Sequence, residues 1–252
     1  MKAVIIAAGR GKRLGPHTQQ RPKCLVEVAG RTILDRQLES FRHNGIRDIC
    51  VITGWQGHLI DRPGLSYRRN QDWERNNILL SLSHAHDFLD DETIVTYSDL
   101  VMTPATLAPL VAHVMDRPFA LQADTDYAAY YQGRSDHPVG EAESIIWDEQ
   151  TMAVREVGKR IPHKEATMGE FTGVWRLSRE GCLLWTQAFR QAQQETGDGP
   201  FGYAPCFTQA FLTDLMMWLM ARGVGFSAVP GRRQVMEIDT EQDLSRVHDF
   251  LK

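Results

Sequence analysis

Long apolar runs and an excess of one charge are both absent from this sequence. No apolar stretch approaches the roughly 18 to 20 residues that a membrane-spanning helix requires. Lys and Arg number 28 and Asp and Glu number 32, which leaves a formal net charge of −4 over 252 residues. This balance produces no global field that would favour nucleic acid or an anionic membrane, so we expect neither as a partner. An anionic ligand would have to be captured by a local group of residues.

Cysteine is scarce and scattered. The four cysteines, Cys24, Cys50, Cys182 and Cys206, show no C-x-x-C spacing, which argues against a zinc knuckle and against a disulfide framework. A secretory signal is not expected either, because only Lys2 precedes a short apolar run and most of the nearby charge follows that run. We therefore expect a protein of the reducing cytoplasm.

Internal repeats, low-complexity segments and long linkers are also missing. The longest candidate linker is the loop 196–202 (TGDGPFG). A chain of 252 residues, 42% of them apolar, can bury a full core in one large domain. We predict a single domain over residues 1–252, in which about residues 124–175 contribute a lobe that binds the substrate.

Glycine and positive charge are concentrated at the start of the chain. Residues 3–8 (AVIIAA) have the pattern of a short buried strand, which Gly9 interrupts. The loop that follows, 9–16 (GRGKRLGP), combines glycines, which allow close backbone approach, with the cations Arg10, Lys12 and Arg13. This combination is suited to binding a polyphosphate.

Other interpretations of this loop compete with phosphate binding. A dinucleotide-binding loop needs G-x-G-x-x-G, but Leu14 stands at the third glycine position and Gly15 comes one residue late. A nicotinamide-dependent oxidoreductase also needs an acid about 20 residues further on, and Glu27 is near that spacing. A loop of the G-x-x-x-x-G-K-[ST] type is absent because Pro16 follows Gly15. A basic surface turn remains the plainest alternative.

Strand and helix signals alternate through the first half of the chain. Apolar residues recur at helical spacing in 33–44 and 78–88, and strand patterns occupy 48–53, 93–99 and the stretch near 65–70. This alternation predicts βαβ units. We therefore predict an α/β fold, Rossmann-like, with a mixed, mainly parallel sheet and helices on both faces.

The second half of the sequence is less regular. We expect the following elements there: strands at 119–123, 171–177 and 226–229, a hairpin across 144–157, and helices at 179–195, 207–222 and the C-terminus. Ligands of parallel sheets bind at the carboxyl ends of the strands. The glycine-rich loop and Asp99 would both lie at that edge.

Acidic residues near strand ends are candidates for binding a divalent cation. Asp99 follows a strand, and alternation places Glu237 and Asp239 on one side of 237–239 (EID). Together they could hold Mg²⁺ against a triphosphate, because hard cations prefer carboxylate oxygens. Each acid could also have a purely structural role as a turn or helix-capping residue. The pair His84 and His86 is not expected to bind a metal, because positions i and i+2 of a helix point apart. We expect these histidines to lie on a solvated helix face instead.

The sequence also resembles a known family. Residues 7–14 (AAGRGKRL), followed by 21–25 (RPKCL) and Gly30, resemble the signature of nucleotidyltransferases that condense a nucleoside triphosphate with a phosphorylated small molecule. Later segments are similar to the small cytidylyltransferases that act on phosphocholine, phosphonates and related metabolites: 53–55 (TGW), 97–99 (YSD), 157–159 (VGK), 169–173 (GEFTG), 237–239 (EID) and the spaced tyrosines, Arg134 and Glu143 of 124–144. The resemblance extends over nearly the whole chain.

This resemblance implies roles for individual residues. Arg13, Lys23 and Asp99 would be catalytic, and Mg²⁺ would be bound by Asp99 with Glu237 and Asp239. The nucleotide would be held by the following residues: Ala7, Ala8, Gly9, Arg10, Gly11, Gln19, Asn76, Asn77, Ser81 and Ser98. The acceptor would be held by a second set: Tyr131, Arg134, Glu143, Lys159, Glu170 and Asp214.

The sequence thus predicts a Mg²⁺-dependent cytidylyltransferase that transfers CMP from CTP to the phosphate or phosphonate of a small molecule and releases pyrophosphate. CTP and a small acceptor are the expected partners, and the sequence leaves the question of a homodimer open. A sugar-1-phosphate nucleotidyltransferase using UTP, dTTP or GTP shares the same signature. A non-catalytic nucleotide-binding regulator would be expected to have lost Lys23 or a metal-binding acid, and Lys23, Asp99 and Asp239 are all present.

Overall fold

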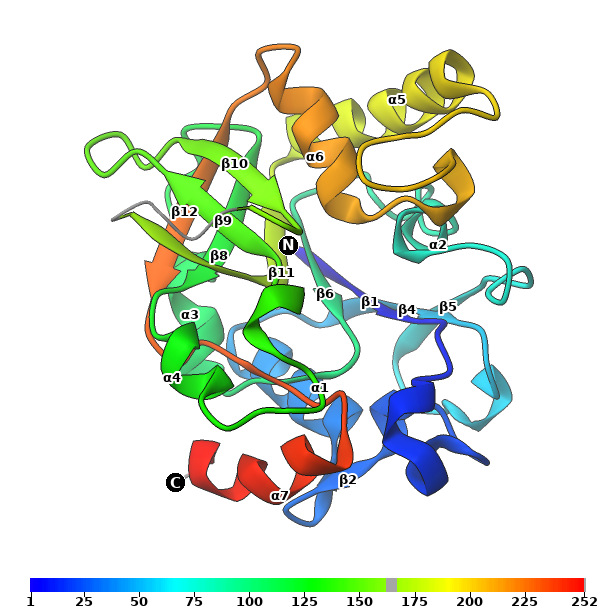
Figure 1. Cartoon of the computed structure of the whole chain (residues 1–252). Coiled ribbons are helices and arrows are strands. Elements are labelled where there is room, and N and C mark those ends of the chain that lie inside the picture. The colour runs from blue at the N-terminus through cyan, green and yellow to red at the C-terminus, as the bar shows by residue number, and fades with distance from the viewer. Residues whose placement is uncertain (162–166, 252) are drawn as a thin grey trace.

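One nine-stranded sheet forms the centre of the molecule, and helices cover both of its faces (Figure 1). The computed structural model describes residues 1–161 and 167–251. Seven strands follow one another across the sheet in this order: β10 (Val154–Gly158), β9 (Ser144–Trp147), β11 (Met168–Leu177), β6 (Thr93–Tyr97), β1 (Lys2–Ala7), β4 (Asp48–Thr53) and β5 (Leu65–Arg69). The remaining two strands extend from β11: β8 (Phe119–Asp124) pairs with β11 and with β12 (Phe226–Gly231). The predicted mixed α/β sheet is confirmed.

The N-terminal strands form a parallel half. β1 lies between β4 and β6 and is parallel to both, and β5 is parallel to β4. The short hairpin of β2 (Glu27–Val28) and β3 (Arg31–Thr32) precedes α1 (Ile33–His43). Thr32 caps that helix, because its hydroxyl accepts a hydrogen bond from the Asp35 amide at 3.1 Å. The parallel arrangement brings the carboxyl ends of β1 and β6 to the same edge of the sheet.

The other half of the sheet is built around β11. This strand runs antiparallel to β6, β8 and β9, and β9 and β10 form the hairpin that the sequence predicted. β12 then returns parallel to β8. The sheet is therefore mixed, with its antiparallel strands supplied by the part of the chain in which the sequence pattern was least regular.

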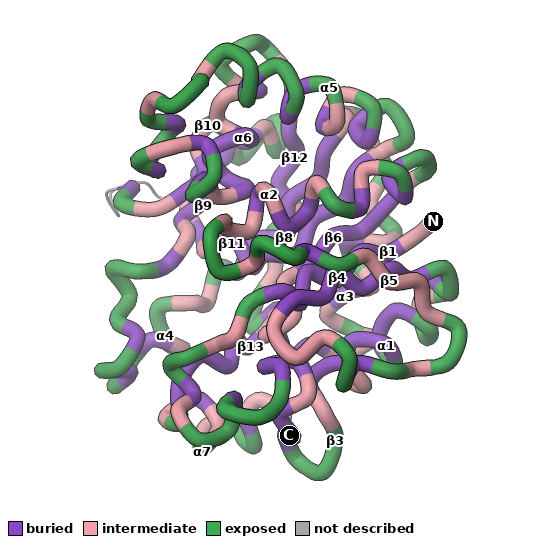
Figure 2. The backbone as a smooth tube through the Cα atoms, turned by 90° about the vertical axis from the view of Figure 1, so that its right-hand side faces the viewer, coloured by how far each residue is buried: buried purple, intermediate pink, exposed green. Residues whose placement is uncertain are grey.

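Apolar side chains form a separate core on each face of the sheet. Trp175 and Trp185 belong to the core under α2 (Ile78–Ser83), α5 (Arg179–Thr196) and α6 (Leu212–Met220). Phe41 and Leu110 belong to the core under α1 and α3 (Pro104–Ala112). Figure 2 shows that burial follows the strands and the inner sides of these helices. None of the described helices has the length and apolar character that a membrane crossing needs.

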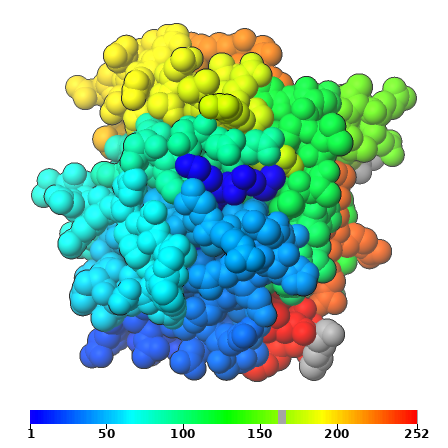
Figure 3. All heavy atoms as spheres, turned by 180° about the vertical axis from the view of Figure 1, so that it is seen from behind, coloured from blue at the N-terminus to red at the C-terminus, as the bar shows by residue number. Residues whose placement is uncertain are grey.

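The C-terminal segment folds back against the N-terminal third of the chain, where the two lie side by side in the space-filling view (Figure 3). β13 (Met236–Glu237) pairs antiparallel with β7 (Leu100–Val101), and α7 (Glu241–Phe250) follows. Val247 packs with Leu14 and Ile33 in a small third core. The Ile238 amide donates to the Asp99 carbonyl at 2.9 Å. This pairing brings the 237–239 segment beside Asp99.

Several expected elements differ from those observed. α2 ends at Ser83, and turns occupy most of the remainder of the predicted helix 78–88. His84 is exposed, whereas the ring of His86 packs edge-on against Phe189 with 4.9 Å between centroids, so the expectation of a solvated pair is wrong for His86. The predicted helix 207–222 is divided into a 3₁₀ turn, η5 (Phe207–Gln209), and α6. α3 was not anticipated, although its Thr103-Pro104 start is a recognisable capping signal.

Candidate active site

A cavity of about 410 Å³ opens at the carboxyl ends of β1 and β6. The glycine-rich loop, the start of α2, β11 and the 237–239 segment all contribute to its walls. The structure brings most of the predicted site residues into this lining: Ala8, Gly9, Gly11, Arg13, Lys23, Asn76, Asn77, Ser81, Ser98, Asp99, Tyr131, Glu143, Lys159, Glu170, Glu237 and Asp239. Residues that are far apart in the sequence thus face a single space.

The glycine-rich loop has a fixed backbone. Gly11 is in the left-handed region at φ +69°, and it starts the 3₁₀ helix η1 (Lys12–Thr18). A Cβ at this position would lie 2.9 Å from Cδ of Lys23. The Thr18 hydroxyl donates to the Gly11 carbonyl at 2.9 Å, and the Trp55 amide donates to the Ala8 carbonyl at the same distance. The loop therefore needs glycine at position 11 to let Lys23 pass behind it.

Lys23 is buried between two acids. Its Nζ donates to Oδ2 of Asp99 at 2.8 Å and also to Oδ1 of Asp239. Burial alone would lower the pKa of the ammonium, but the carboxylates of Asp99 and Asp239 outweigh burial and raise it. Lys23 is consequently a fixed positive charge within the site.

Glu237 and Asp239 both face the cavity, as strand alternation predicted. Asp239 accepts from Lys23 on one oxygen and from Arg13 on the other. These cations and the adjacent His137 hold the pKa of Asp239 low, although burial opposes them. Burial and the nearby charges of Asp239 and Asp99 raise the pKa of Glu237 well above its ordinary value. A cluster of acids in which one carboxylate is destabilised by its neighbours is a setting that a divalent cation would relieve.

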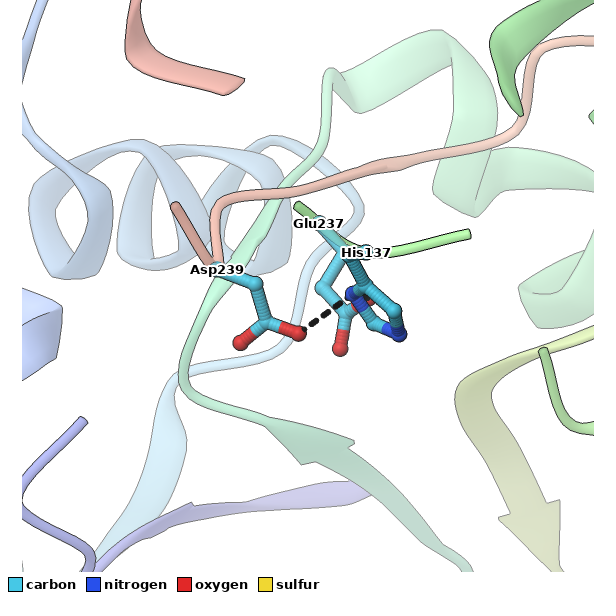
Figure 4. Close-up of side chains that lie close together, drawn as sticks. All are labelled: His137, Glu237 and Asp239. Carbon is cyan, nitrogen blue, oxygen red and sulfur yellow. Dashed lines mark ion pairs between the residues drawn. The ribbon is translucent and has the colours of Figure 1, made fainter. Parts of the chain in front are cut away.

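His137 is a residue that the sequence analysis missed. Its Nδ1 lies 2.8 Å from Oδ2 of Asp239 and 3.4 Å from Oε2 of Glu237 (Figure 4). The polar loop around it gives no spacing signal for a contact with a segment so distant in the chain. Its position depends on tertiary contacts: the Tyr130 hydroxyl donates to the Glu237 carbonyl at 2.7 Å, and Arg134 is paired with Asp243.

The donor set suits a divalent metal ion. Oδ1 of Asp99 is buried and has no hydrogen-bond partner within the described part of the chain. His137, Glu237 and Asp239 each offer an atom within 4.8 Å of the others. Carboxylate oxygens suit Mg²⁺, and an imidazole nitrogen beside them suits Mn²⁺, Fe²⁺ or Zn²⁺. The residues therefore fit the cation that the sequence analysis expected.

One wall of the cavity carries amide and hydroxyl groups. Nδ2 of Asn70 donates to Oδ1 of Asn76 at 2.8 Å and to the Ser81 hydroxyl at 3.0 Å, which fixes both lining side chains. Asn77 caps α2, since its Oδ1 accepts from the Ile78 amide at 2.9 Å. Trp73, which the sequence analysis did not select, also lines this wall.

Another part of the cavity lining contains two half-buried carboxylates. Glu143 accepts from the Tyr97 hydroxyl at 3.0 Å, and Glu170 accepts from the Tyr131 hydroxyl at 2.5 Å. Burial raises the pKa of Glu143, and it raises the pKa of Glu170 to about 7. Lys159, whose Nζ lies 4.6 Å from the centre of the Phe211 ring, is also in the lining. This part of the lining is polar and combines both signs of charge.

Five predicted residues lie outside the cavity lining: Ala7, Arg10, Gln19, Arg134 and Asp214. Ala7 is buried in β1, Gln19 is exposed at the end of η1, and Arg10 lies over the Trp55 ring at 4.7 Å. Arg134 forms a buried ion pair with Asp243, with Nε 2.7 Å from Oδ1.

Asp214 has a structural position as well. Its carboxylate accepts from the Phe211 and Tyr203 amides at the start of α6. Arg134 and Asp214 therefore do not face the space where an acceptor could bind, and we do not retain them as acceptor-binding residues.

The chain is similar in sequence to known proteins. The family model for a MobA-like NTP transferase domain matches residues 3–167. A Campylobacter jejuni protein named CTP:phosphoglutamine cytidylyltransferase is 24% identical over 189 residues, which are 71% of this chain and 73% of that protein.

Two further relatives match over shorter stretches. A Streptomyces rubellomurinus CMP-5'-(3-aminopropyl)phosphonate synthase is 33% identical over 120 residues, which are 44% of this chain and 19% of that protein. A Streptococcus pneumoniae choline-phosphate cytidylyltransferase is 46% identical over 61 residues, which are 24% of this chain and 27% of that protein. Each of these two sequence matches covers only a minor part of the relative.

Solved structures show the same fold. The CTP:phosphocholine cytidylyltransferase from Streptococcus pneumoniae has a TM-score of 0.73 at 20% identity, covering 100% of this chain and 99% of that one. The inositol-1-phosphate CTP transferase from T. maritima has a TM-score of 0.73 at 18% identity, covering 99% and 94%.

Proposed function

Because this chain belongs to the family with a MobA-like NTP transferase domain, we propose that it transfers CMP from CTP to the phosphate or phosphonate of a small molecule and releases pyrophosphate. The relatives support the choice of nucleotide and acceptor, since their names specify cytidylyl transfer to phosphoglutamine, phosphocholine and the formation of a CMP-linked aminopropylphosphonate. A phosphonate, phosphocholine or a phosphorylated amino-acid-like compound is the acceptor class that we propose here.

One observation carries this proposal. The glycine-rich loop, Lys23, Asp99 and Asp239 meet in one cavity, with the Lys23 ammonium bridging both carboxylates. Nucleotidyl transfer needs a positive charge such as that of Lys23 beside the phosphates. Negative charge develops on the departing pyrophosphate and must be stabilised where it forms. A simple basic surface turn would not bury its lysine between two acids.

Different residues of the chain would bind the phosphates and the nucleoside. The backbone of Ala8 to Gly11 would hold the phosphates, while Asn76, Ser81 and Trp73 would contact the nucleoside. The side chain of Arg13 is half exposed, so it can turn from Asp239 towards the triphosphate. Lys23 would neutralise charge on the α-phosphate from behind the loop.

The fold family also implies a divalent cation, and we propose Mg²⁺. Asp99, Glu237 and Asp239 would hold it. When bound, it supplies positive charge to the phosphate oxygens and so lowers the repulsion between nucleotide and acceptor.

The transfer itself is a substitution at the α-phosphorus. An acceptor oxygen forms the new bond to phosphorus, and the bond between that phosphorus and the pyrophosphate oxygen breaks. No general base is required, because the second pKa of a phosphate monoester is about 6 and the attacking group is already largely dianionic near neutral pH. Lys159 would orient the acceptor phosphate, while Glu143, Glu170 and Tyr131 would contact the remainder of the acceptor. We propose that the segment 124–175, apart from residues 162–166, which lie outside the described part of the chain, forms this acceptor lobe within a single domain.

A two-way substrate panel tests the function. CTP, UTP, dTTP, GTP and ATP would each be paired with phosphocholine, aminoethylphosphonate, phosphorylated glutamine and hexose-1-phosphates, and pyrophosphate would be measured with Mg²⁺ present. We expect turnover with CTP and a phosphate or phosphonate acceptor. Turnover only with a hexose-1-phosphate and UTP, dTTP or GTP would assign the chain to the sugar branch, and nucleotide binding without any turnover would indicate a regulator.

A further inference from the structure

The surroundings of His137 differ from those of an ordinary buried histidine. The side chain is only 6% exposed, and its Nδ1 forms an ion pair with Asp239 that is not directed as a hydrogen bond. Even so, Oδ2 of Asp239 lies 2.8 Å from Nδ1 and Oε2 of Glu237 lies 3.4 Å from it. A buried imidazole nitrogen that approaches two carboxylates without a hydrogen bond needs an explanation.

The spacing of these atoms matches the coordination shell of one ion. When metal–ligand bonds are about 2.1 Å long, neighbouring ligand atoms of an octahedral ion lie about 3 Å apart. Both distances from Nδ1 are close to that value. Figure 4 shows the two carboxylates and the imidazole nitrogen converging on a common space.

The other ring nitrogen of His137 supports the same arrangement. Nε2 lies 3.4 Å from Oε2 of Glu141. A carboxylate at the far nitrogen of a metal-binding histidine fixes the tautomer and directs the other nitrogen towards the metal. Glu141 is placed to do this when a cation takes the position between Nδ1 and Asp239, where the closer contact of the ring now lies.

Asp239 presents its two oxygens to different neighbours. Oδ1 contacts Lys23, which also holds Asp99, whereas Oδ2 faces His137 and Glu237. Two cations lie near this second group: Arg13 contacts Oδ2 of Asp239, and Arg134 lies 3.7 Å from Oε2 of Glu237. The Arg13 side chain is half exposed and can turn away from Asp239, and the distance between Arg134 and Glu237 is long for an ion pair. In the nucleotide-free protein, Lys23 therefore blocks the side of Asp239 that faces Asp99, and a cation can reach the side that faces His137 when Arg13 turns away from Oδ2.

We propose that His137, Glu237 and Asp239 together bind one divalent ion in the absence of nucleotide, with Nδ1 of His137 as a direct ligand. The inference rests on the proposed function only for treating Asp239 as a metal ligand. A site with one imidazole and two carboxylates accepts Mn²⁺, Fe²⁺ or Zn²⁺ more readily than an all-oxygen site does, because imidazole is a poorer ligand for Mg²⁺ than for these ions. The chain should therefore bind Mn²⁺ more tightly than Mg²⁺ before any nucleotide arrives.

Manganese itself is the probe for the test. The full chain would be treated with a chelator, desalted and titrated with Mn²⁺ without nucleotide, and bound ion would be followed by loss of the free Mn²⁺ electron paramagnetic resonance signal. Pulsed measurements would then detect ¹⁴N coupling, repeated with ¹⁵N-labelled histidine. We expect one bound ion, a nitrogen coupling that changes with the label, and displacement only by a large excess of Mg²⁺.

Three variants make the test specific. His137→Gln should weaken Mn²⁺ binding on the order of tenfold or more and remove the nitrogen coupling. His84→Gln changes an exposed histidine outside the cavity and should behave as the unaltered chain does. Asp99→Asn should retain both the bound Mn²⁺ and its nitrogen coupling.

Other outcomes would overturn the inference. Bound Mn²⁺ without histidine coupling would show that His137 only positions Asp239, and no binding at all would show that the three residues form an ordinary ion-pair network. The labelled unaltered chain decides this even if His137→Gln fails to fold. CMP transfer with Mg²⁺ in the substrate panel would leave the proposed function standing in either case.

Discussion

At the scale of single residues, Gly11 shows how closely the loop is fitted to Lys23. Its φ of +69° is unfavourable for other residues, and an added Cβ would meet the Lys23 side chain. We expect Gly11→Ala to lower the free energy of unfolding by about 1 to 2 kcal/mol, measured by urea denaturation. Gly9→Ala is the matched control, because nothing lies within 4 Å of its added Cβ. Equal losses in both variants would contradict this explanation.

Asp99 is the residue whose charge matters most to the proposed chemistry. Its unpartnered Oδ1 and its contact with Lys23 give it no evident structural task apart from the site. Asp99→Asn should reduce kcat by roughly 10² to 10³-fold while thermal unfolding changes little. Asp198→Asn, in an exposed loop, should keep full activity. An active Asp99→Asn enzyme would remove Asp99 from the mechanism.

Glu170 should make stability depend on pH. Burial raises its folded-state pKa from 4.5 to about 7, so the folded protein binds this proton more tightly than the unfolded chain does. The contribution of Glu170 to the free energy of unfolding is then largest below about pH 4.5 and decreases as pH rises to about 7. A shift of this size corresponds to about 3 kcal/mol at 1.36 kcal/mol per unit.

The isosteric variant Glu170→Gln isolates this effect, because its amide oxygen can still accept from Tyr131. We expect the variant to gain stability relative to the unaltered chain as pH rises from 5 to 8, measured as the free energy of unfolding at each pH. A stability difference that does not change with pH would mean that Glu170 is not protonated in the folded state.

At the scale of elements, the segment from α4 (Tyr127–Tyr131) to η4 (Val139–Glu141) is held in place by α7 and β13. The Arg134–Asp243 pair is fully buried and joins that segment to the first turn of α7. Removing one partner of a buried pair leaves an uncompensated charge, so Arg134→Ala should cost about 3 to 5 kcal/mol of stability. Thermal or urea unfolding measures this.

A surface arginine is the control for that prediction. Arg232 pairs with Asp126 at 3.5 Å with its side chain 78% exposed, so Arg232→Ala should change stability by less than about 0.5 kcal/mol. If Arg134→Ala were as mild, the segment would not depend on α7 for its position.

Elements with strong local patterns were the ones predicted well. The β1 run, α1 with its Thr32 cap and the β9–β10 hairpin carry periodicity or turn signals that local physics determines. α2 ended early because the turns after Ser83 bury Ala85 and Phe88 by tertiary packing, which no helical pattern reports. Arg134 was assigned to the acceptor because a sequence cannot show that Asp243, far along the chain, neutralises it.

At the scale of the whole molecule, the site depends on distant segments meeting at one edge of the sheet. The parallel pairing of β1 with β6 brings the glycine-rich loop near Asp99, and the pairing of β7 with β13 adds Glu237 and Asp239. The sequence predicted the first meeting from the strand–helix–strand pattern. The contribution of His137 could not be predicted, because it depends on how the segment after β8 crosses to α7.

A crystal structure with CTP and Mg²⁺ bound tests the central claim most directly. The account predicts the triphosphate on the backbone of residues 8–11, Lys23 and Arg13 on its phosphates, and a magnesium ion held by Asp99 and Asp239. A nucleotide bound away from this loop, or a metal ion that neither carboxylate touches, would contradict it.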